Sequence, residues 1–246
     1  MSTAANDLRP TDPQTDWEGW KAERHARVTA PQGELALIQT TWLPDGALPD
    51  AAAALAGQPA SVTYTELTRS NIDTGAPEHG YRLWDALSEG PRTFAGVPMF
   101  DYDPAWVVQA HFAPVSAERT IPYEHIRDAG GTRDLVVPGD ITATIAGAEY
   151  TLSAFDDDGA LLLVFGDPTN GSESPDDRTY ASGRFLFVQR PAGSSFGEEA
   201  DVVLDFNRAF VPPCGYSDQY NCPLPPAQNR LAVPVRAGER YVQRAA

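Results

Sequence analysis

The hydrophobic pattern of the chain starts with helical spacing and then changes to short apolar runs. Trp17 and Trp20 lie three residues apart, and the helical pattern continues until a Pro-Gln-Gly segment at 31–33 interrupts it. Asp16 is of a residue type that commonly caps a helix N-terminus. We therefore predict a helix over about residues 16–29, with its tryptophans docked on the body of the protein.

Beyond this helix, apolar residues occur in short runs separated by Gly, Pro and Asp, and several runs alternate with polar positions. Such alternation is typical of a strand with one face in the core. Two runs flanking Gly147 predict a hairpin. One helix and many short strands favour a mainly β fold, an antiparallel sandwich or barrel-like β domain with an N-terminal helix. The strand candidates are residues 35–38, 42–43, 61–68, 81–84, 105–112, 134–137, 140–146, 149–154, 161–165, 184–189, 202–206, 231–235 and 240–242.

The domain organisation follows from the same pattern. Residues 1–13 are polar and contain prolines, which is typical of a flexible arm. No internal repeat and no low-complexity linker divides the remainder, which is long enough to bury a core of its own. We therefore expect a single β-rich domain at residues 14–246.

The charge of the chain is strongly acidic. Its 34 Asp and Glu face 18 Lys and Arg, which gives a formal net charge of −16, and Lys21 is its sole lysine. Such a surface repels itself at low ionic strength, but the Debye length falls to roughly 3 Å near 1 M salt. This composition indicates a halophilic protein of a salt-rich cytoplasm; the alternative is an acidic protein of an ordinary GC-rich bacterium.

We expect the stability of the protein to rise steeply with salt, because screening weakens the repulsion among its excess carboxylates. Thermal melting in 0.1 M and in 2 M potassium chloride would measure this effect. An unchanged midpoint would show that the acidic surface has no part in stability.

Composition also argues against two classes of partner. Nucleic-acid binding requires clustered Lys and Arg, whereas the densest charge run here is the acidic segment Asp156 to Asp158. The longest strongly apolar run, residues 161–165, is far shorter than the roughly 18 residues of a membrane-spanning helix. These two observations lead us to expect neither nucleic-acid binding nor membrane association. The first residues lack the pattern of an export signal, and we therefore expect a cytoplasmic location.

Polar motifs are concentrated in the last third of the chain, in an arrangement that is unlikely by chance. These motifs are Asp167-x-Thr169-x-Gly171, Gly183-Arg184-Phe185-Leu186, Asp205-Phe206-Asn207, Pro212-Pro213-Cys214, Cys222-Pro223-Leu224-Pro225-Pro226 and Asn229-x-Leu231. Together they resemble the domain of unknown function family 1684, a bacterial and archaeal family without an established activity. The resemblance extends upstream to the helix that carries Trp17 and Trp20, and to residues 31–37, 42–43, 94–97 and 103–106.

The charged residues of these motifs are the candidates for chemistry. They lie at strand ends or in the loops that follow, where a β scaffold can direct side chains from several segments to one place. We hypothesise that Arg184 neutralises one carboxylate and leaves the other free to accept a proton or to hold a ligand hydroxyl. The catalytic candidates are Asp205, Arg184 and Asp167; the ligand-binding candidates are Asn207 beside them, Tyr180 and Asn229 at the rim, and Thr169.

Cys214 and Cys222 are the two cysteines of the chain, and we predict that they lie close together because proline-rich segments flank the turn between them. Four interpretations remain open: packed thiols, a disulfide, a catalytic or redox thiol, or two metal ligands. The histidines show no ligand spacing relative to these cysteines, and no phosphate loop or dinucleotide motif is present. We therefore expect no metal and no cofactor.

These observations favour a protein that binds or transforms a small polar molecule, sugar-like or carboxylate-like, in a pocket of Asp, Arg, Asn and Tyr side chains. The alternative is a non-enzymatic structural or protein-interaction module in which the same motifs stabilise the fold. The sequence does not name a reaction, and it does not indicate an oligomeric state.

Overall fold

The computed structural model describes residues 12–43, 48–70, 75–116 and 118–245, so most of the predicted arm at residues 1–13 lies outside the described residues. Helix α1 spans Pro13–Val28. Its N-cap is Asp12 and not Asp16, because the Asp12 carboxylate accepts a hydrogen bond from Thr15 N at 3.2 Å and Pro13 suits the first helical position. The predicted helix is therefore present, with a start three residues earlier.

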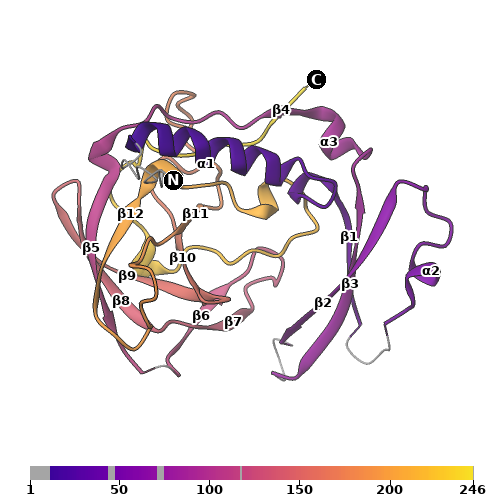
Figure 1. Cartoon of the computed structure of the whole chain (residues 1–246), viewed down its shortest axis with the longest axis horizontal. Helices are drawn as coiled ribbons and strands as arrows, with labels where there is room; N and C mark the ends of the chain where they lie inside the picture. The colour runs from indigo at the N-terminus through magenta and orange to yellow at the C-terminus, as the bar shows by residue number, and fades with distance from the viewer. Residues whose placement is uncertain (1–11, 44–47, 71–74, 117, 246) are drawn as a thin grey trace, which may run out of the picture.

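Within the described residues, the largest sheet has six antiparallel strands in the order β11-β10-β9-β8-β5-β12. It curls into a half-barrel, seen on the left of Figure 1. The predicted mainly β fold with an N-terminal helix is confirmed. The strands are β5 (Val107–Pro114), β8 (Gly139–Ile145), β9 (Ala148–Asp157), β10 (Ala160–Phe165), β11 (Arg184–Phe187) and β12 (Ala200–Asp205).

A second sheet lies on the opposite side of the molecule (Figure 1). It is antiparallel, with the order β1-β3-β2. Two further strand pairs, β4 with β13 and β6 with β7, complete the sheets of the described chain. The bounds are β1 (Leu37–Leu43), β2 (Val62–Ser70), β3 (Pro77–Asp85), β4 (Phe94–Gly96), β6 (Thr120–Glu124), β7 (Thr132–Val136) and β13 (Gln243–Arg244); the short helices are α2 (Ala51–Ala54) and α3 (Glu89–Thr93).

The core of the half-barrel follows the predicted alternation. In β8 the residues alternate between buried and more exposed positions, and Ile141 and Ile145 are fully buried. The predicted hairpin is the β8–β9 pair, whose turn residues Ala146 and Gly147 both have positive φ, at 49° and 85°. Two consecutive residues with positive φ give the turn a twist that matches the strands on either side.

Helix α1 packs across the top of the half-barrel (Figure 1). The indole nitrogen of Trp17 donates to Asn207 O at 2.9 Å, and Trp20 packs against the core cluster that contains Leu37 and Trp84. The predicted docking of the helix by its tryptophans is confirmed. In the part of the chain that the structure describes, no helix is both long and apolar enough to cross a membrane.

The predicted strand at 231–235 is wrong, because this segment is irregular in the structure. Its carbonyl groups are used differently: Val235 O accepts a hydrogen bond from the side chain of Arg184 at 2.8 Å. A buried guanidinium requires such acceptors, so Val235 serves the arginine, while Leu231 N donates to Gly166 O just beyond the end of β10.

Candidate functional site

Arg184 and Asp167 form an ion pair inside the protein. Arg184 begins β11, opposite Phe165 of β10, and Asp167 follows the end of β10. The Nη2 atom of Arg184 lies 2.9 Å from Asp167 Oδ2, and neither side chain is exposed. Further donors of the guanidinium contact Val235 O and Ala237 O. Burial lowers the pKa of Arg184, and the carboxylate of Asp167 opposes this effect.

The remaining contacts of this pair are mostly to the backbone, apart from Arg184 Nη2, which lies 3.5 Å from the Thr169 hydroxyl. Asp167 Oδ1 accepts from Thr169 N at 2.9 Å and from Val235 N at 3.1 Å. The hydroxyl of Thr169 lies 2.8 Å from that of Thr179. Both oxygens of Asp167 are occupied and its side chain is closed off from solvent, so the pair joins the C-terminal segment to the sheet.

Asp205 and Asn207 belong to a separate network. Asp205 Oδ1 accepts from the backbone and side-chain nitrogens of Asn207, at 3.2 and 3.0 Å. The Asn207 amide in turn bonds both the N and the O of Asp103, at 3.0 Å each. In the described part of the chain, no hydrogen bond or ion pair joins this network to Arg184 or Asp167. The structure therefore brings the four predicted residues together as two pairs and not as one site.

The two predicted rim residues also have other partners. Asn229 is fully buried, where its amide bonds Ser153 N and O and Val164 O at 2.8 to 2.9 Å. It therefore fixes β9 to β10. The Tyr180 hydroxyl lies 3.6 Å from Cys214 Sγ.

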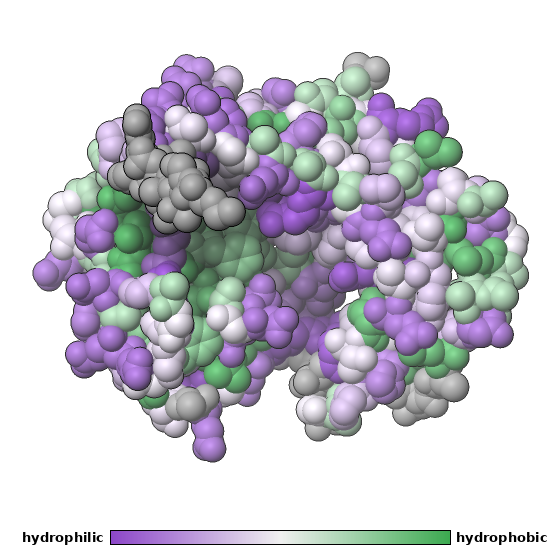
Figure 2. All heavy atoms as spheres, in the orientation of Figure 1, coloured by the Kyte–Doolittle hydropathy of each residue, from purple (hydrophilic) through white to green (hydrophobic). Residues whose placement is uncertain are grey.

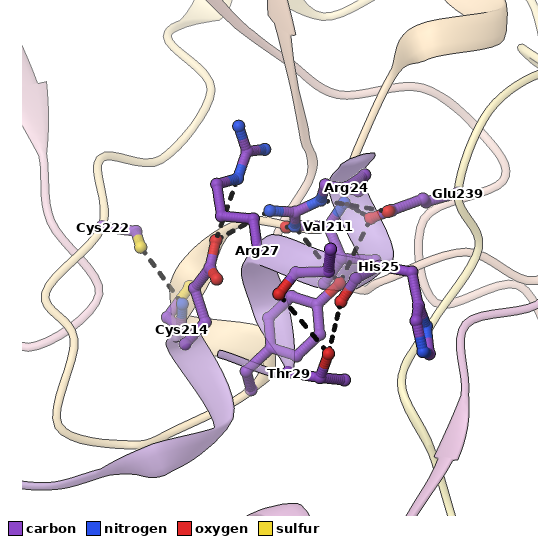
Figure 3. Close-up of polar contacts among 11 residues, drawn as sticks. Arg24, His25, Arg27, Thr29, Val211, Cys214, Cys222 and Glu239 are labelled. Carbon is purple, nitrogen blue, oxygen red and sulfur yellow. Dashed lines mark hydrogen bonds and ion pairs between the residues drawn. The ribbon is translucent and has the colours of Figure 1, made fainter. Parts of the chain in front are cut away.

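A further buried ion cluster, centred on Arg24 of α1, was not predicted (Figure 3). Its guanidinium lies 2.7 Å from Glu34 and 3.1 Å from Glu239, and it donates to Val211 O at 2.9 Å. Burial acts to lower the pKa of Arg24, but Glu239, Tyr216 and Glu34 outweigh it and raise this pKa above its ordinary value. The only sequence signal was a charged residue on the helix face that carries Trp17 and Trp20.

The predicted proximity of the two cysteines is confirmed. Cys214 N donates to Cys222 Sγ at 3.3 Å, as drawn in Figure 3, and both thiols are free. Cys222 is buried and Cys214 is partly exposed. Among the described residues, no group of three or more His, Cys, Asp or Glu side chains is placed to hold a metal ion.

The candidate site lies in a cleft of about 860 Å³ between the three-stranded sheet and the β6–β7 hairpin. Figure 2 shows a notch at this place, below the centre of the view, with hydrophilic residues beside it. Pockets of this volume accommodate small molecules. One wall of the cleft consists of Thr40, Trp42, Leu67, Thr68, Arg69, Gly75 and Arg82, and the other of His125, Thr132, Arg133, Asp134, Leu135, Gln219 and Asn221.

Arg82 is the lining arginine for which the described residues supply no carboxylate partner. Its side chain makes no hydrogen bond or ion pair within the part of the chain that the structure describes, and its Nε is buried. The guanidinium lies 5.0 Å from the ring centre of Tyr220 and 5.8 Å from that of Trp84. Burial lowers the pKa of Arg82. An arginine of this kind is held in place by packing and retains its donors for a molecule in the cleft.

The other cationic residues of the cleft already have carboxylate partners. Arg69 lies 2.6 Å from Glu78 and stacks on the Trp42 ring, with 3.8 Å between the guanidinium and the ring centre. Arg133 lies 2.9 Å from Asp128. These two arginines therefore contribute a reduced positive field. Arg82 is the lining arginine for which the described structure shows no carboxylate partner, and Asp134 adds one carboxylate to the facing wall.

His125 and Thr40 supply two further polar atoms. The Nδ1 atom of His125 lies 3.0 Å from Tyr123 O, and because a carbonyl only accepts, Nδ1 carries the proton. Burial lowers the pKa of His125, which favours the neutral ring with its lone pair on Nε2. That atom can accept a proton or a hydrogen bond from a bound molecule. The buried hydroxyl of Thr40 has no partner in the described structure.

The cleft wall is encoded by a period of two that the sequence analysis did not follow. Thr40, Arg82 and Thr65 are cross-strand neighbours on β1, β3 and β2, so their side chains share a face. Gly80, two residues before Arg82, is required because a Cβ there would lie 2.8 Å from the Trp42 ring and 2.5 Å from Thr41 O. The alternation from Gly80 to Trp84 is the signal that could have identified this wall.

The fold and the site define a mainly β protein in which buried Asp-Arg-Asn networks hold the sheets and an arginine lies unpaired in a cleft. The chain belongs to the family described as protein of unknown function (DUF1684), whose model matches residues 92–240. This confirms the resemblance inferred from the motifs. The match includes the cleft wall from His125 to Asn221, whereas the wall from Thr40 to Arg82 lies outside it.

The chain is also similar to a solved structure, the solution NMR structure of an uncharacterized protein of Haloarcula marismortui from gene locus rrnAC0354. The two share 32% sequence identity, and the similarity covers 60% of this chain and 77% of the other, with a TM-score of 0.46. No curated protein matches the chain.

Proposed function

We propose that the protein binds a small anionic molecule, with a carboxylate or phosphate group, in the cleft between the three-stranded sheet and the β6–β7 hairpin. The observation that carries the proposal is the unpaired, partly buried guanidinium of Arg82. A planar guanidinium presents paired donors that match two oxygens of a carboxylate or phosphate.

The surroundings of Arg82 support this chemistry. The Tyr220 and Trp84 rings lie beside the guanidinium and restrict its conformational freedom, which reduces the entropy lost on binding. His125 lines the same cleft, where its Nε2 can accept a hydrogen bond. A chain with a net charge of −16 repels anions at long range. Arg82 lacks a carboxylate partner although the chain is rich in carboxylates, and this supports a bound anion as its counter-ion.

The family motifs have a different role in this proposal. Arg184, Asp167, Asp205, Asn207 and Asn229 stabilise the frame that carries one cleft wall, through the buried contacts described above. The cleft requires both sheets, so we also propose that residues 14–246 fold as one domain. The acidic composition supports a salt-rich cytoplasmic setting.

The proposal is tested by replacing Arg82 with glutamine. We expect the affinity for inorganic phosphate or citrate, measured by isothermal titration calorimetry or NMR shifts, to fall at least about tenfold, because a hydrogen bond to a charged group contributes about 1.5–3 kcal/mol. The melting temperature is expected not to fall, since the replacement orphans no partner of Arg82.

Arg92→Gln is the matched control, because Arg92 is exposed on α3 and outside the cleft lining, and its replacement changes the net charge equally. Equal losses of affinity in the two variants would indicate a general charge effect. Wild-type protein that binds neither anion would remove the support for anion binding.

A further inference from the structure

The two cysteines lie at the ends of a loop that forms part of the cleft wall. Gln219 and Asn221 of this loop line the cleft, and the Tyr220 ring packs against Arg82. Gln219 Oε1 accepts from Thr40 N at 3.2 Å, and Asn221 Oδ1 accepts from Arg127 N at 2.9 Å. The position of this loop therefore determines one side of the cleft.

At the ends of the loop the two cysteines are in contact. Cys222 Sγ accepts a hydrogen bond from Cys214 N at 3.3 Å. The Tyr180 hydroxyl approaches Cys214 Sγ from the other side, at 3.6 Å. Cys214 is partly exposed, whereas Cys222 is buried, so a reagent from solvent meets Cys214 first.

Their surroundings make the two thiols unequal. Interaction with Cys222 is the largest influence on the pKa of Cys214 and lowers it; burial opposes this effect, and the Tyr180 hydroxyl adds to the lowering. Interaction with Cys214 and burial raise the pKa of Cys222, although the hydrogen bond from Cys214 N acts in the opposite direction. A thiolate is the reactive form of cysteine, so Cys214 has the character of an attacking thiol and Cys222 that of a resolving one.

We propose that Cys214 and Cys222 form a modification site at which a hydroperoxide closes a reversible disulfide across the base of the cleft loop. The Cys214 thiolate attacks the peroxide oxygen, and the O–O bond breaks to give a sulfenic acid at Cys214 and hydroxide or alkoxide. The Cys222 thiol then attacks this sulfur, and water leaves as the S–S bond forms. The two cysteines together lose two electrons, which reduce the peroxide.

The disulfide covalently ties the two ends of the loop that carries Gln219, Tyr220 and Asn221. It also removes the ionisable thiol of Cys222, which is one of the groups that influence the pKa of Arg82. The inference that oxidation alters anion binding rests on the proposed function, whereas the disulfide itself does not.

The test uses the full-length reduced protein and hydrogen peroxide. Because the chain has only these two cysteines, free-thiol counting and intact mass report the site directly. We expect the loss of both thiols and of two hydrogens in mass, without dimers, and reversal by dithiothreitol. Cys222→Ser is expected to stop at a sulfenic acid on Cys214 that dimedone traps, and Cys214→Ser to react at least about tenfold more slowly.

Labelling of the wild-type protein tests the proposal without any variant, so it remains valid if a cysteine variant fails to fold. Limiting iodoacetamide followed by peptide mapping is expected to label Cys214 before Cys222. Preferential labelling of Cys222, or oxidation that yields only intermolecular dimers, would overturn the proposal.

For the link to the cleft, phosphate affinity is expected to differ at least about threefold between the oxidised and reduced forms, a change of about 0.65 kcal/mol. Equal affinities would overturn that link alone, and phosphate binding to neither form would count against the proposed function while the disulfide stands.

Discussion

Replacing Arg184 with methionine is expected to lower the free energy of unfolding by about 3–5 kcal/mol, the cost of breaking a buried ion pair from one side. The change leaves the fully buried carboxylate of Asp167 without its cation, and it leaves Val235 O and Ala237 O without their donors. Methionine fills much of the same volume, so the loss reflects charge and hydrogen bonding more than packing. Urea denaturation at fixed salt measures it.

Two variants make this measurement specific. Arg236→Met breaks an exposed pair with Asp177 and is expected to cost less than about 1 kcal/mol. Adding Asp167→Asn to Arg184→Met removes the stranded charge and is expected to recover part of the loss. A cost for Arg184→Met no larger than that of Arg236→Met would show that the buried pair does not stabilise the fold.

The second large effect is expected at Glu239. Its carboxylate lies 3.1 Å from Arg24 and accepts from Val211 N at 2.7 Å, in a cluster that fixes helix α1 to the C-terminal segment (Figure 3). Glu239→Gln keeps the shape and one acceptor but removes the charge that balances Arg24. We expect a loss of about 3 kcal/mol in the free energy of unfolding.

Glu34→Gln is the matched comparison for Glu239→Gln. Glu34 also pairs with Arg24, at 2.7 Å, but its side chain is more exposed, at 14% against 4% for Glu239. Water can therefore compensate for part of its loss, and we expect a cost of about 1 kcal/mol. A larger effect at Glu34 than at Glu239 would contradict the role assigned to burial in this cluster.

The spacing and alternation of apolar residues predicted the elements whose formation depends on neighbouring residues in the sequence. The alternation in residues 140–154 predicted the β8–β9 hairpin, and the spacing of Trp17 and Trp20 predicted a docked helix. The sequence also predicted that Arg184 pairs with one of two carboxylates, Asp167 or Asp205, because a buried arginine requires an acidic partner; the structure pairs it with Asp167. Each of these predictions needs only the period of an element or the charge of a near neighbour.

The candidate site could not be found in the same way. Arg82 lies on a strand that begins at Pro77, and the Pro, His and Gly residues before Tyr81 read as a loop. Whether Arg82 has a carboxylate partner depends on the folded structure, because the sequence contains many carboxylates that could pair with it. The strand predicted at 231–235 is absent for a related reason. The carbonyl oxygen of Val235 in that segment accepts a hydrogen bond from the side chain of Arg184, 51 residues away in the sequence.

The two walls of the cleft come from different parts of the chain, and this has an evolutionary consequence. The wall from His125 to Asn221 lies in the segment that the family model matches, and the wall with Thr40 and Arg82 does not. Selection for a stable frame would therefore act mainly on the matched segment, whereas selection for a particular ligand would also act on the facing sheet that carries Arg82. Relatives could retain every C-terminal motif while the facing sheet diverged. Shared motifs would then indicate a scaffold of common ancestry, but they would not indicate a common ligand.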